Sequence, residues 1–270
     1  MELGLKNKTA IVTGTNNPQG IGAATALALA SEGVRIALVY KRIPHKVDDS
    51  KTGFNGLDRY FKSNSGDMTE VENKLKAINS DFIVLESDIS DEQCVKDIFD
   101  RAITQYGKVD ILVNNAAAAD DGDNDTIDAL TQSVIDYTFA TNVRGTLLMV
   151  REFVKRRGSY GRIINFSTDA AQAYPGVQIT YSASKAATEA FTRNIAIGVG
   201  KYGITVNCIS PGPTQTGWID TELETTVLPH IPLGRLIQPK DIADTVVFLA
   251  SERAAMVTGQ VIKVSGGHAL

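Results

Sequence analysis

The sequence predicts a doubly wound parallel α/β sheet that folds as a single domain over residues 1–270. Short β-branched apolar runs alternate with longer amphipathic segments along the whole chain. Right-handed crossovers between successive parallel strands then place helices on both faces of the sheet. We find no repeat or linker, and 270 residues with 43% hydrophobic and 21% charged residues suit one large domain.

Seven strands account for this alternation, over Thr9–Thr13, Val34–Tyr40, Phe82–Glu86, Ile111–Asn114, Arg162–Phe166, Thr205–Ile209 and Val261–Val264. The predicted helices are Gly22–Ser31, Thr69–Ala77, Glu92–Gln105, Ile127–Lys155, Thr180–Lys201 and Pro239–Ala250. Two segments depart from the pattern, Lys41–Asp67 and Gly212–Arg235. The first exceeds the roughly 2–6 residues usual for such a connection, and the second has a short helical pattern among turn residues. Both are candidate lids or binding loops.

Composition excludes several classes of protein. Lys and Arg number 27 against 31 Asp and Glu, so the formal charge of -4 gives no basic field for nucleic acid. No apolar run approaches the ~18 residues of a membrane span, and Met1–Thr9 lacks a signal-peptide core. We therefore expect a cytoplasmic protein with no membrane partner. Cys94 and Cys208 cannot build a disulfide framework and are expected to be reduced thiols.

A glycine-rich turn separates the first strand from its helix. We expect Gly14 to permit the tight turn, Gly20 to permit close approach of a phosphate, and Gly22 to permit close packing of helix on sheet. Free N–H groups and the positive helix end favour an anion at this place. The context predicts a dinucleotide site, with a plain turn as the alternative. No Gly-Lys-Ser/Thr follows, which argues against a Walker-type loop.

The end of the second strand favours NADP over NAD. NAD sites usually carry an acid about 20 residues after the glycine turn, where this chain has Val39-Tyr40-Lys41-Arg42. Lys41 and Arg42 suit a 2′-phosphate, although two solvated bases at a strand end would be ordinary. We therefore predict NADP as the cofactor, with NAD as the second choice.

Tyr181 and Lys185 lie four residues apart in a predicted helix and therefore share one face. A phenol has a pKa near ~10, and a nearby ammonium favours the phenolate. We expect Lys185 to lower the pKa of Tyr181 so that the tyrosine can act as acid or base near neutral pH. Taken alone, such a pair is mostly structural.

Further motifs surround this pair in a fixed order. They are Thr13-Gly14, Asp88-Ile89, Asn114-Asn115-Ala116-Ala117, Asn142, Ser167-Thr168-Asp169, Pro211-Gly212-Pro213-Thr214 with Thr216, and Val264-Ser265-Gly266-Gly267. Together with the tyrosine and the lysine they resemble the short-chain dehydrogenase/reductase family over essentially the whole chain. The resemblance implies a Rossmann fold and an NAD(P)-dependent oxidoreductase acting on CH–OH groups.

The resemblance also implies a catalytic set. Tyr181 would be the acid/base, and Lys185 would modulate its pKa and bind the nicotinamide ribose. Asn142 would kink its helix and position a proton-relay water. The family's catalytic hydroxyl lies thirteen residues before the tyrosine and is usually serine, whereas this chain has Thr168 there and Ser167 one place earlier. We prefer Thr168, because neighbouring strand residues face opposite sides.

The family's cofactor contacts transfer to matching positions. The implied set is Gly14, Asn16, Gly20, Ile21, Gly22, Tyr40, Lys41, Arg42, Asp88, Ile89, Asn115, Ala116, Tyr181, Lys185, Pro211, Gly212, Thr214 and Thr216. Asp88 and Ile89 would touch adenine, and Asn114 would offer its backbone beside the adenosine ribose. Thr214 and Thr216 would hold the carboxamide and the phosphates. Helix capping, a strand-end turn and a loop hydroxyl are the structural alternatives for Asp88, Asn114 and Thr214.

Two segments depart from the family pattern. The first two glycines of the turn are separated by five residues, Thr15–Gln19, where the family has three. The turn must therefore bulge. The connection Lys41–Asp67 is longer than the family's, and it either covers the adenosine end or forms an exposed loop.

The implied reaction is NADPH-dependent reduction of a carbonyl to a secondary alcohol, with a free or acyl-carrier-linked 3-oxoacyl or related β-keto compound as candidate substrate. A sugar or polyol dehydrogenase and a non-catalytic dinucleotide-binding regulator are the alternatives. An enoyl reductase is disfavoured, because that branch separates tyrosine and lysine by six residues and Gln178 stands seven before Lys185. The Ala116–Asp125 loop, the segment after Thr168 and the Thr214–Arg235 lid would shape the substrate pocket. Trp218, Ile219 and Leu223 would form an apolar wall there, with ordinary packing of the lid as the alternative.

We predict no metal site. His45, His230 and His268 lack ligand spacing. The acidic stretch Asp120–Asp125 superficially suggests calcium, but the EF-hand register places Thr126 at the glycine position. An exposed turn is the better interpretation.

The predicted helices Ile127–Lys155 and Thr180–Lys201 look too apolar for a purely solvent-facing layer. Members of the family commonly pair these helices across a two-fold axis. We therefore predict a homotetramer of D₂ symmetry.

Overall fold

The structure, a computed structural model, describes residues 2–44, 56–119, 125–169, 171 and 176–269. The strands are β1 (Thr9–Thr13), β2 (Arg35–Tyr40), β3 (Phe82–Glu86), β4 (Ile111–Asn114), β5 (Gly161–Phe166), β6 (Ile204–Pro211) and β7 (Val261–Val264). The α-helices are α1 (Ile21–Ser31), α2 (Leu57–Ser65), α3 (Thr69–Ala77), α4 (Glu92–Tyr106), α5 (Gln132–Phe139), α6 (Thr146–Lys155), α8 (Ile179–Val199), α9 (Thr221–Val227) and α10 (Pro239–Ala250).

All seven strands pair in parallel in the order β3-β2-β1-β4-β5-β6-β7. The chain builds outward from β1 in one direction and then resumes at β4 on the other side. In sheets of this kind such a reversal forms a crevice at the carboxyl ends of the two strands, here β1 and β4, and ligands usually bind there. The predicted Rossmann-like sheet is therefore confirmed.

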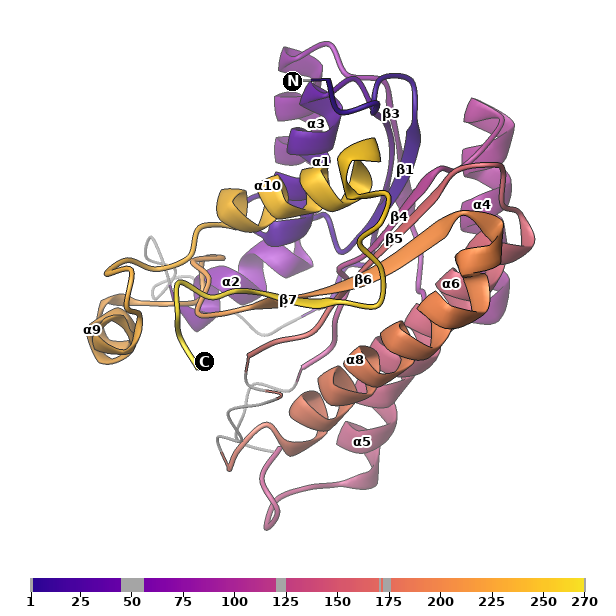
Figure 1. The fold of residues 1–270 in the computed structure, drawn as a ribbon. Helices are drawn as coiled ribbons and strands as arrows, with labels where there is room; N and C mark the ends of the chain where they lie inside the picture. The colour runs from indigo at the N-terminus through magenta and orange to yellow at the C-terminus, as the bar shows by residue number, and fades with distance from the viewer. Residues whose placement is uncertain (1, 45–55, 120–124, 170, 172–175, 270) are drawn as a thin grey trace.

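Helices cover both faces of the sheet (Figure 1). On one face α1, α3 and α10 pack against side chains such as Val12, and on the other α4, α6 and α8 pack against side chains such as Ile11. Adjacent residues of β1 thus enter different cores, because side chains alternate along a strand. Both faces of the central strands are buried, which explains their continuous apolar runs.

The single helix predicted over Ile127–Lys155 is wrong. The regular helix begins only at Gln132, and a π-helical turn over Ala140–Gly145 separates α5 from α6. Gly145 lies against the segment that follows β3, where an added Cβ would be 3.0 Å from Ile89. A wide turn inside a helix commonly marks a functional region.

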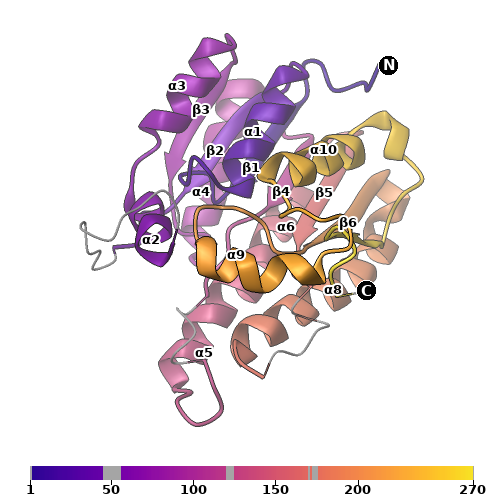
Figure 2. The same cartoon turned by 90° about the vertical axis from the view of Figure 1, so that its left-hand side faces the viewer.

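Part of the Lys41–Asp67 connection forms a helix, α2, which the sequence pattern did not predict. None of its residues is fully buried, and only Leu57, Tyr60 and Phe61 of its nine residues are apolar, so its composition resembles that of a loop. Residues 45–55 of this connection lie outside the described part. Figure 2 shows α2 and α9 at the same edge of the sheet, where β2 and β6 end.

Within the described ranges, we find no helix that is both long and apolar enough to cross a membrane.

Candidate active site

The glycine turn presses α1 closely against β1. Gly14 has a φ of +71°, and its N–H donates to the carbonyl of Val39 at 2.8 Å. A Cβ on Gly22 would lie 2.1 Å from the carbonyl oxygen of Gly14, so no side chain fits there. Gly20 is the N-cap of α1 and supplies no side-chain cap, which leaves the first-turn N–H groups, beginning at Ile21, to meet an anion. This geometry fits a dinucleotide diphosphate.

Asn115 and Ala116 fasten the glycine turn to the end of β4. The Asn115 side chain donates to the carbonyls of Thr13 and Gly14, both at 2.9 Å. In return, Thr13 Oγ1 accepts from the N–H of Asn115 at 3.1 Å and of Ala116 at 2.9 Å. The buried Asn114 side chain instead donates to Asn165 at 2.8 Å, a contact within the sheet.

Asn16 lies in the inserted part of the turn and contacts α2. Its Nδ2 donates to the carbonyl of Asn64 at 2.7 Å and to that of Gly66 at 3.3 Å. Thr15, Asn16 and Asn17 are all buried. The tip of the turn is thus covered by protein, and the Asn16 amide holds α2.

The bases predicted to recognise a 2′-phosphate already have carboxylate partners. Arg42 forms a two-bonded ion pair with Glu86, at 2.8 Å from Nε and 2.6 Å from the terminal nitrogen. The phenol of Tyr40 also donates to Glu86, at 3.3 Å. The hydrogen bonds from Arg42 lower the pKa of Glu86, so this carboxylate stays charged. A 2′-phosphate would have to share Arg42 with Glu86.

Asp88 does not cap a helix, which was the structural alternative, because Asp91 is the N-cap of α4. Asp88 pairs with Lys41 at 2.5 Å and accepts from the N–H and hydroxyl of Ser90 at 2.8 and 2.7 Å. Burial alone would raise the pKa of Asp88, but the bonds from Lys41 and Ser90 outweigh it and lower the pKa. The neighbouring Ile89 is buried and packs into the core on the α4 side.

The segment after β6 closes the crevice from the other side. Gly212 directly follows Pro211, and its N–H donates to the carbonyl of Val264 at 3.1 Å. The Thr214 hydroxyl donates to the carbonyl of Gly212 at 2.8 Å. The carbonyl of Thr216 accepts from the Asn17 side chain at 3.0 Å. Two predicted cofactor-binding segments, far apart in sequence, therefore meet directly.

Tyr181 and Lys185 face the end of β5. Lys185 Nζ lies 5.5 Å from the centre of the Tyr181 ring and donates to the carbonyl of Phe166 at 2.9 Å. Burial lowers the pKa of Lys185 to about 8. Burial also raises the pKa of Tyr181, and nearby Tyr60 and Asp169 raise it further. The expected lowering of the phenol pKa is therefore not a property of the protein alone, because burial disfavours the charged phenolate.

The structure separates the two candidate hydroxyls. Ser167 is buried, and its hydroxyl donates to Glu189 at 2.8 Å, inside the contact between β5 and α8. Thr168 is partly exposed. Ser167 thus holds the helix to the strand, and this arrangement favours Thr168 as the hydroxyl that meets a substrate.

Asn142 lies in the π-helical turn and is buried. Its side-chain oxygen accepts from the N–H of Ala118 at 2.7 Å, and its nitrogen donates to the Ala118 carbonyl at 2.8 Å and to Ser184 at 2.9 Å. The amide therefore ties the segment after β4 to the helix that carries Tyr181.

The exposed turn predicted over Asp120–Asp125 is wrong at Asp125. Residues 120–124 lie outside the described part. Asp125 is fully buried, and its carboxylate accepts from the N–H of Thr180 at 2.8 Å and of Tyr181 at 3.1 Å. It thus caps the start of α8 and fixes the backbone of the reactive tyrosine. The 55-residue separation left no local signal in the sequence for this role.

Asp169 and His268 were also missed as neighbours of the site. His268 Nδ1 lies 2.6 Å from the buried Asp169 carboxylate. Because Asp169 influences Tyr181, the segment after β7 reaches the vicinity of the reactive pair. Among the described residues no cluster of His, Cys, Asp and Glu suits a metal ion. His45 lies outside them.

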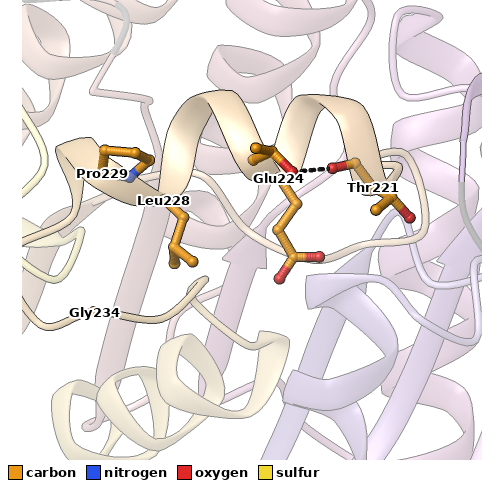
Figure 3. Close-up of a pocket in the computed structure, with 6 residues that line it drawn as sticks. Thr221, Glu224, Leu228, Pro229 and Gly234 are labelled. Atoms are coloured by element: carbon orange, nitrogen blue, oxygen red, sulfur yellow. Dashed lines mark hydrogen bonds between the residues drawn. The ribbon is translucent and has the colours of Figure 1, made fainter.

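A hollow of about 550 Å³ lies beside α9, lined by Thr221, Glu224, Thr225, Leu228, Pro229 and Gly234 (Figure 3). The side chains of Glu224 and Leu228 point to the same side of α9. These lining residues belong to the predicted Thr214–Arg235 lid, and none of them belongs to α8, which carries Tyr181 and Lys185. Trp218 is exposed, whereas Ile219 joins the core, so the predicted apolar wall is partly core packing.

Replacing Asp125 should impair both stability and turnover. Asp125→Ala removes two acceptors at the start of α8 and should lower the free energy of unfolding by about 1–2 kcal/mol. It should also lower kcat, because the Tyr181 backbone loses its acceptor. Denaturant unfolding and steady-state kinetics measure both effects. The control Asp91→Ala removes a similar cap from α4 and should cost stability alone. Unchanged kcat in Asp125→Ala would refute the positioning role.

Lys185 should impose a pH dependence on stability. Its pKa is about 8 in the folded chain against an ordinary 10.5, so above pH 8 the unfolded chain binds a proton that the folded chain does not. The free energy of unfolding should therefore rise with pH, by up to about 1.4 kcal/mol per unit from this group. Burial raises the pKa of Cys208 from 9.0 to about 12 and opposes this trend above pH 9. Urea titrations between pH 8 and 9 should show a smaller rise of unfolding free energy with pH in Lys185→Met than in the wild type. Equal rises in the two proteins would contradict the assignment to Lys185.

Known proteins resemble this chain over nearly its full length. The profile of a family described as Enoyl-(Acyl carrier protein) reductase matches residues 14–269. NADPH-dependent aldehyde reductase 2, chloroplastic, of Arabidopsis thaliana is 36% identical over 270 residues, covering 97% of this chain and 94% of that protein. The 3-oxoacyl-[acyl-carrier-protein] reductase FabG of Staphylococcus aureus is 32% identical over 266 residues, covering 96% and 97%.

A solved short-chain dehydrogenase/reductase from Serratia marcescens superposes with a TM-score of 0.83 at 26% identity, covering 98% of this chain and 99% of that one. The fold, the ordered motifs and the full-length similarity to named reductases lead to the same assignment. The chain belongs to the short-chain dehydrogenase/reductase family and is an oxidoreductase.

Proposed function

We propose that this oxidoreductase uses NADPH to reduce a carbonyl to a secondary alcohol. The observation that carries the proposal is the buried Lys185 beside the ring of Tyr181, where β5 ends next to Thr168. When bound, the dinucleotide supplies a hydride to the carbonyl carbon. Two similar proteins are named an aldehyde reductase and a 3-oxoacyl reductase, which supports aldehydes and β-keto compounds as candidate substrates.

Each reactive residue has a distinct part in this proposal. The Thr168 hydroxyl donates a hydrogen bond to the carbonyl oxygen, and Tyr181 gives that oxygen a proton as it becomes an alkoxide. The raised pKa of Tyr181 keeps the phenol protonated, which suits a proton donor. Lys185 is charged below its pKa of about 8 and favours the phenolate that remains after transfer.

Asn142 has a positioning role in this scheme. Its side chain joins Ala118 to Ser184, one residue before Lys185. It therefore fixes the distance between the segment after β4 and the reactive helix. A relay water beside Asn142 remains a prediction from the family resemblance.

NADP is the proposed cofactor. The N–H groups at the start of α1 suit the diphosphate, and Arg42 keeps unused N–H donors beyond its two bonds to Glu86. An NADPH-dependent relative at 36% identity supports the same choice. The cytoplasmic location predicted from the sequence remains a prediction.

Tyr181→Phe should abolish most of the activity. The substitution removes the proposed proton donor but keeps the ring, so kcat should fall roughly 10²- to 10⁴-fold. Thr168→Val should also reduce turnover, whereas Ser167→Ala should mainly cost stability through its lost bond to Glu189. Oxidation of NADPH with a panel of aldehydes and β-keto esters measures the effect. Near-full activity of Tyr181→Phe on an accepted substrate would disprove the mechanism.

Substitutions at Arg42 and Glu86 should act in opposite directions on NADPH affinity. Arg42→Ala removes a charged donor and should raise the NADPH dissociation constant roughly 10-fold. Glu86→Gln frees Arg42 from an exposed ion pair and should lower the NADPH dissociation constant by up to about fivefold. NADH affinity should stay nearly constant in both variants. Titration of both cofactors tests this, and parallel changes for NADH and NADPH would contradict 2′-phosphate recognition.

We further propose a homotetramer of D₂ symmetry. Large apolar side chains are exposed on the helices predicted to pair, with Ile197 of α8 85% exposed and Ile135 of α5 39% exposed. Burying them in closed isologous contacts would remove this apolar surface from water. Light scattering should give four times the 29.0 kDa chain mass at micromolar concentration. A monomer under these conditions would rule out the assembly.

A further inference from the structure

Arg59 lies on α2, beside the glycine turn. Its Nε donates to the side-chain oxygen of Gln19 at 3.4 Å. Gln19 directly precedes Gly20, the N-cap of α1. A guanidinium therefore lies near the first-turn N–H groups of α1, where the diphosphate of a dinucleotide is expected.

Hydrogen bonds to the backbone at both ends of α2 hold the helix in this position. The Asn16 side chain donates to the carbonyl of Asn64 near the end of α2. At the other end, Gly56 N–H donates to the carbonyl of Gly217, which follows β6, at 2.8 Å. Figure 2 shows α2 at the edge of the sheet that carries the crevice. Arg59 lies between these two attachments, so its direction toward the turn follows from the placement of the helix.

The charges around the crevice distinguish Arg59 from the other bases. Lys41 is paired with Asp88 and Arg42 with Glu86. Among the residues that the structure describes, Arg59 contacts the neutral Gln19 and no carboxylate. A long, neutral hydrogen bond leaves most of the guanidinium donors for a stronger acceptor.

We propose that Arg59 binds the diphosphate of the cofactor, so that the inserted helix α2 contributes a cation to the dinucleotide site. The inference rests on the proposed use of a nicotinamide dinucleotide. A planar guanidinium matches two phosphate oxygens, and the positive end of α1 already favours an anion there. The 2′-phosphate of NADPH has the same chemistry, but Gln19 places Arg59 at the diphosphate end. NADH and NADPH share the diphosphate, but only NADPH has the 2′-phosphate. Comparing the two cofactors therefore shows which of these groups Arg59 binds.

The test is calorimetric titration of the full chain with NADPH and with NADH. Arg59→Ala should raise both dissociation constants by a similar factor, about 10- to 100-fold, as expected for loss of a charged hydrogen bond. Arg59→Lys keeps the charge and should recover part of the affinity. Lys62→Ala removes a charge from the exposed side of the same helix and should leave both constants unchanged.

Gln19→Ala separates ligand binding from helix docking. It deletes the contact between Arg59 and the turn but leaves the guanidinium, so affinity should change little. The salt dependence of binding should weaken in Arg59→Ala and persist in Gln19→Ala. Equal losses in Gln19→Ala and Arg59→Ala, or no loss in Arg59→Ala, would overturn the assignment, and a loss confined to NADPH would move it to the 2′-phosphate.

Failure of the proposed reaction can be distinguished from failure of the Arg59 proposal. A wild-type chain that binds both dinucleotides but reduces no carbonyl refutes the reaction and still tests Arg59. A wild-type chain that binds neither dinucleotide refutes both.

Discussion

The contact between β1 and β4 at their carboxyl ends determines the geometry of the rest of the site. Asn115 donates to two successive carbonyls of the glycine turn, and Thr13 accepts two N–H groups from the chain after β4. These four bonds fix the turn where the strand order reverses. Because Gly22 has no side chain, α1 can approach β1 closely and direct its N-terminal N–H groups into the crevice. The ends of β5 and β6 then border the same crevice.

The two insertions form one structural unit. A longer glycine turn carries more buried polar groups, and each of them needs a partner. Asn16 meets the carbonyls of Asn64 and Gly66, while the Thr15 hydroxyl donates to the carbonyl of Val39 at 3.2 Å. The longer turn and the segment around α2 therefore satisfy each other's polar groups.

Much of the fold could be predicted from the sequence because its signals are local. Each parallel strand buried on both faces reads as a continuous apolar run, and glycines mark the turn that packs against β4. The preference for Thr168 over Ser167 followed from strand alternation and stays a prediction, while Ser167 donates to Glu189 in the structure. These inferences needed only neighbouring residues and the periods of regular structure.

The remainder depended on contacts between distant residues. The pairs Lys41–Asp88 and Arg42–Glu86 depend on how β2 lies beside β3, which no local pattern specifies. The pKa of Tyr181 depends on burial by several segments, so the motif alone gave the wrong direction. The π-helical turn in the Ile127–Lys155 region reflects tertiary packing around Asn142 and Gly145. Long-range packing, rather than propensity, decided each of these cases.

The buried Asp125 has a consequence for protein engineering. Its carboxylate joins the end of the Ala116–Asp125 segment to the backbone of α8 at Thr180 and Tyr181. A chimera that receives this loop from another protein would therefore also exchange the group that fixes Tyr181. Transplants that keep an acidic residue at position 125, and that keep the backbone contacts of Ala116 with Thr13 and of Ala118 with Asn142, preserve the attachments of this segment. The segment is therefore best treated as a module that is constrained at both ends, so redesign is limited to the residues between these attachments.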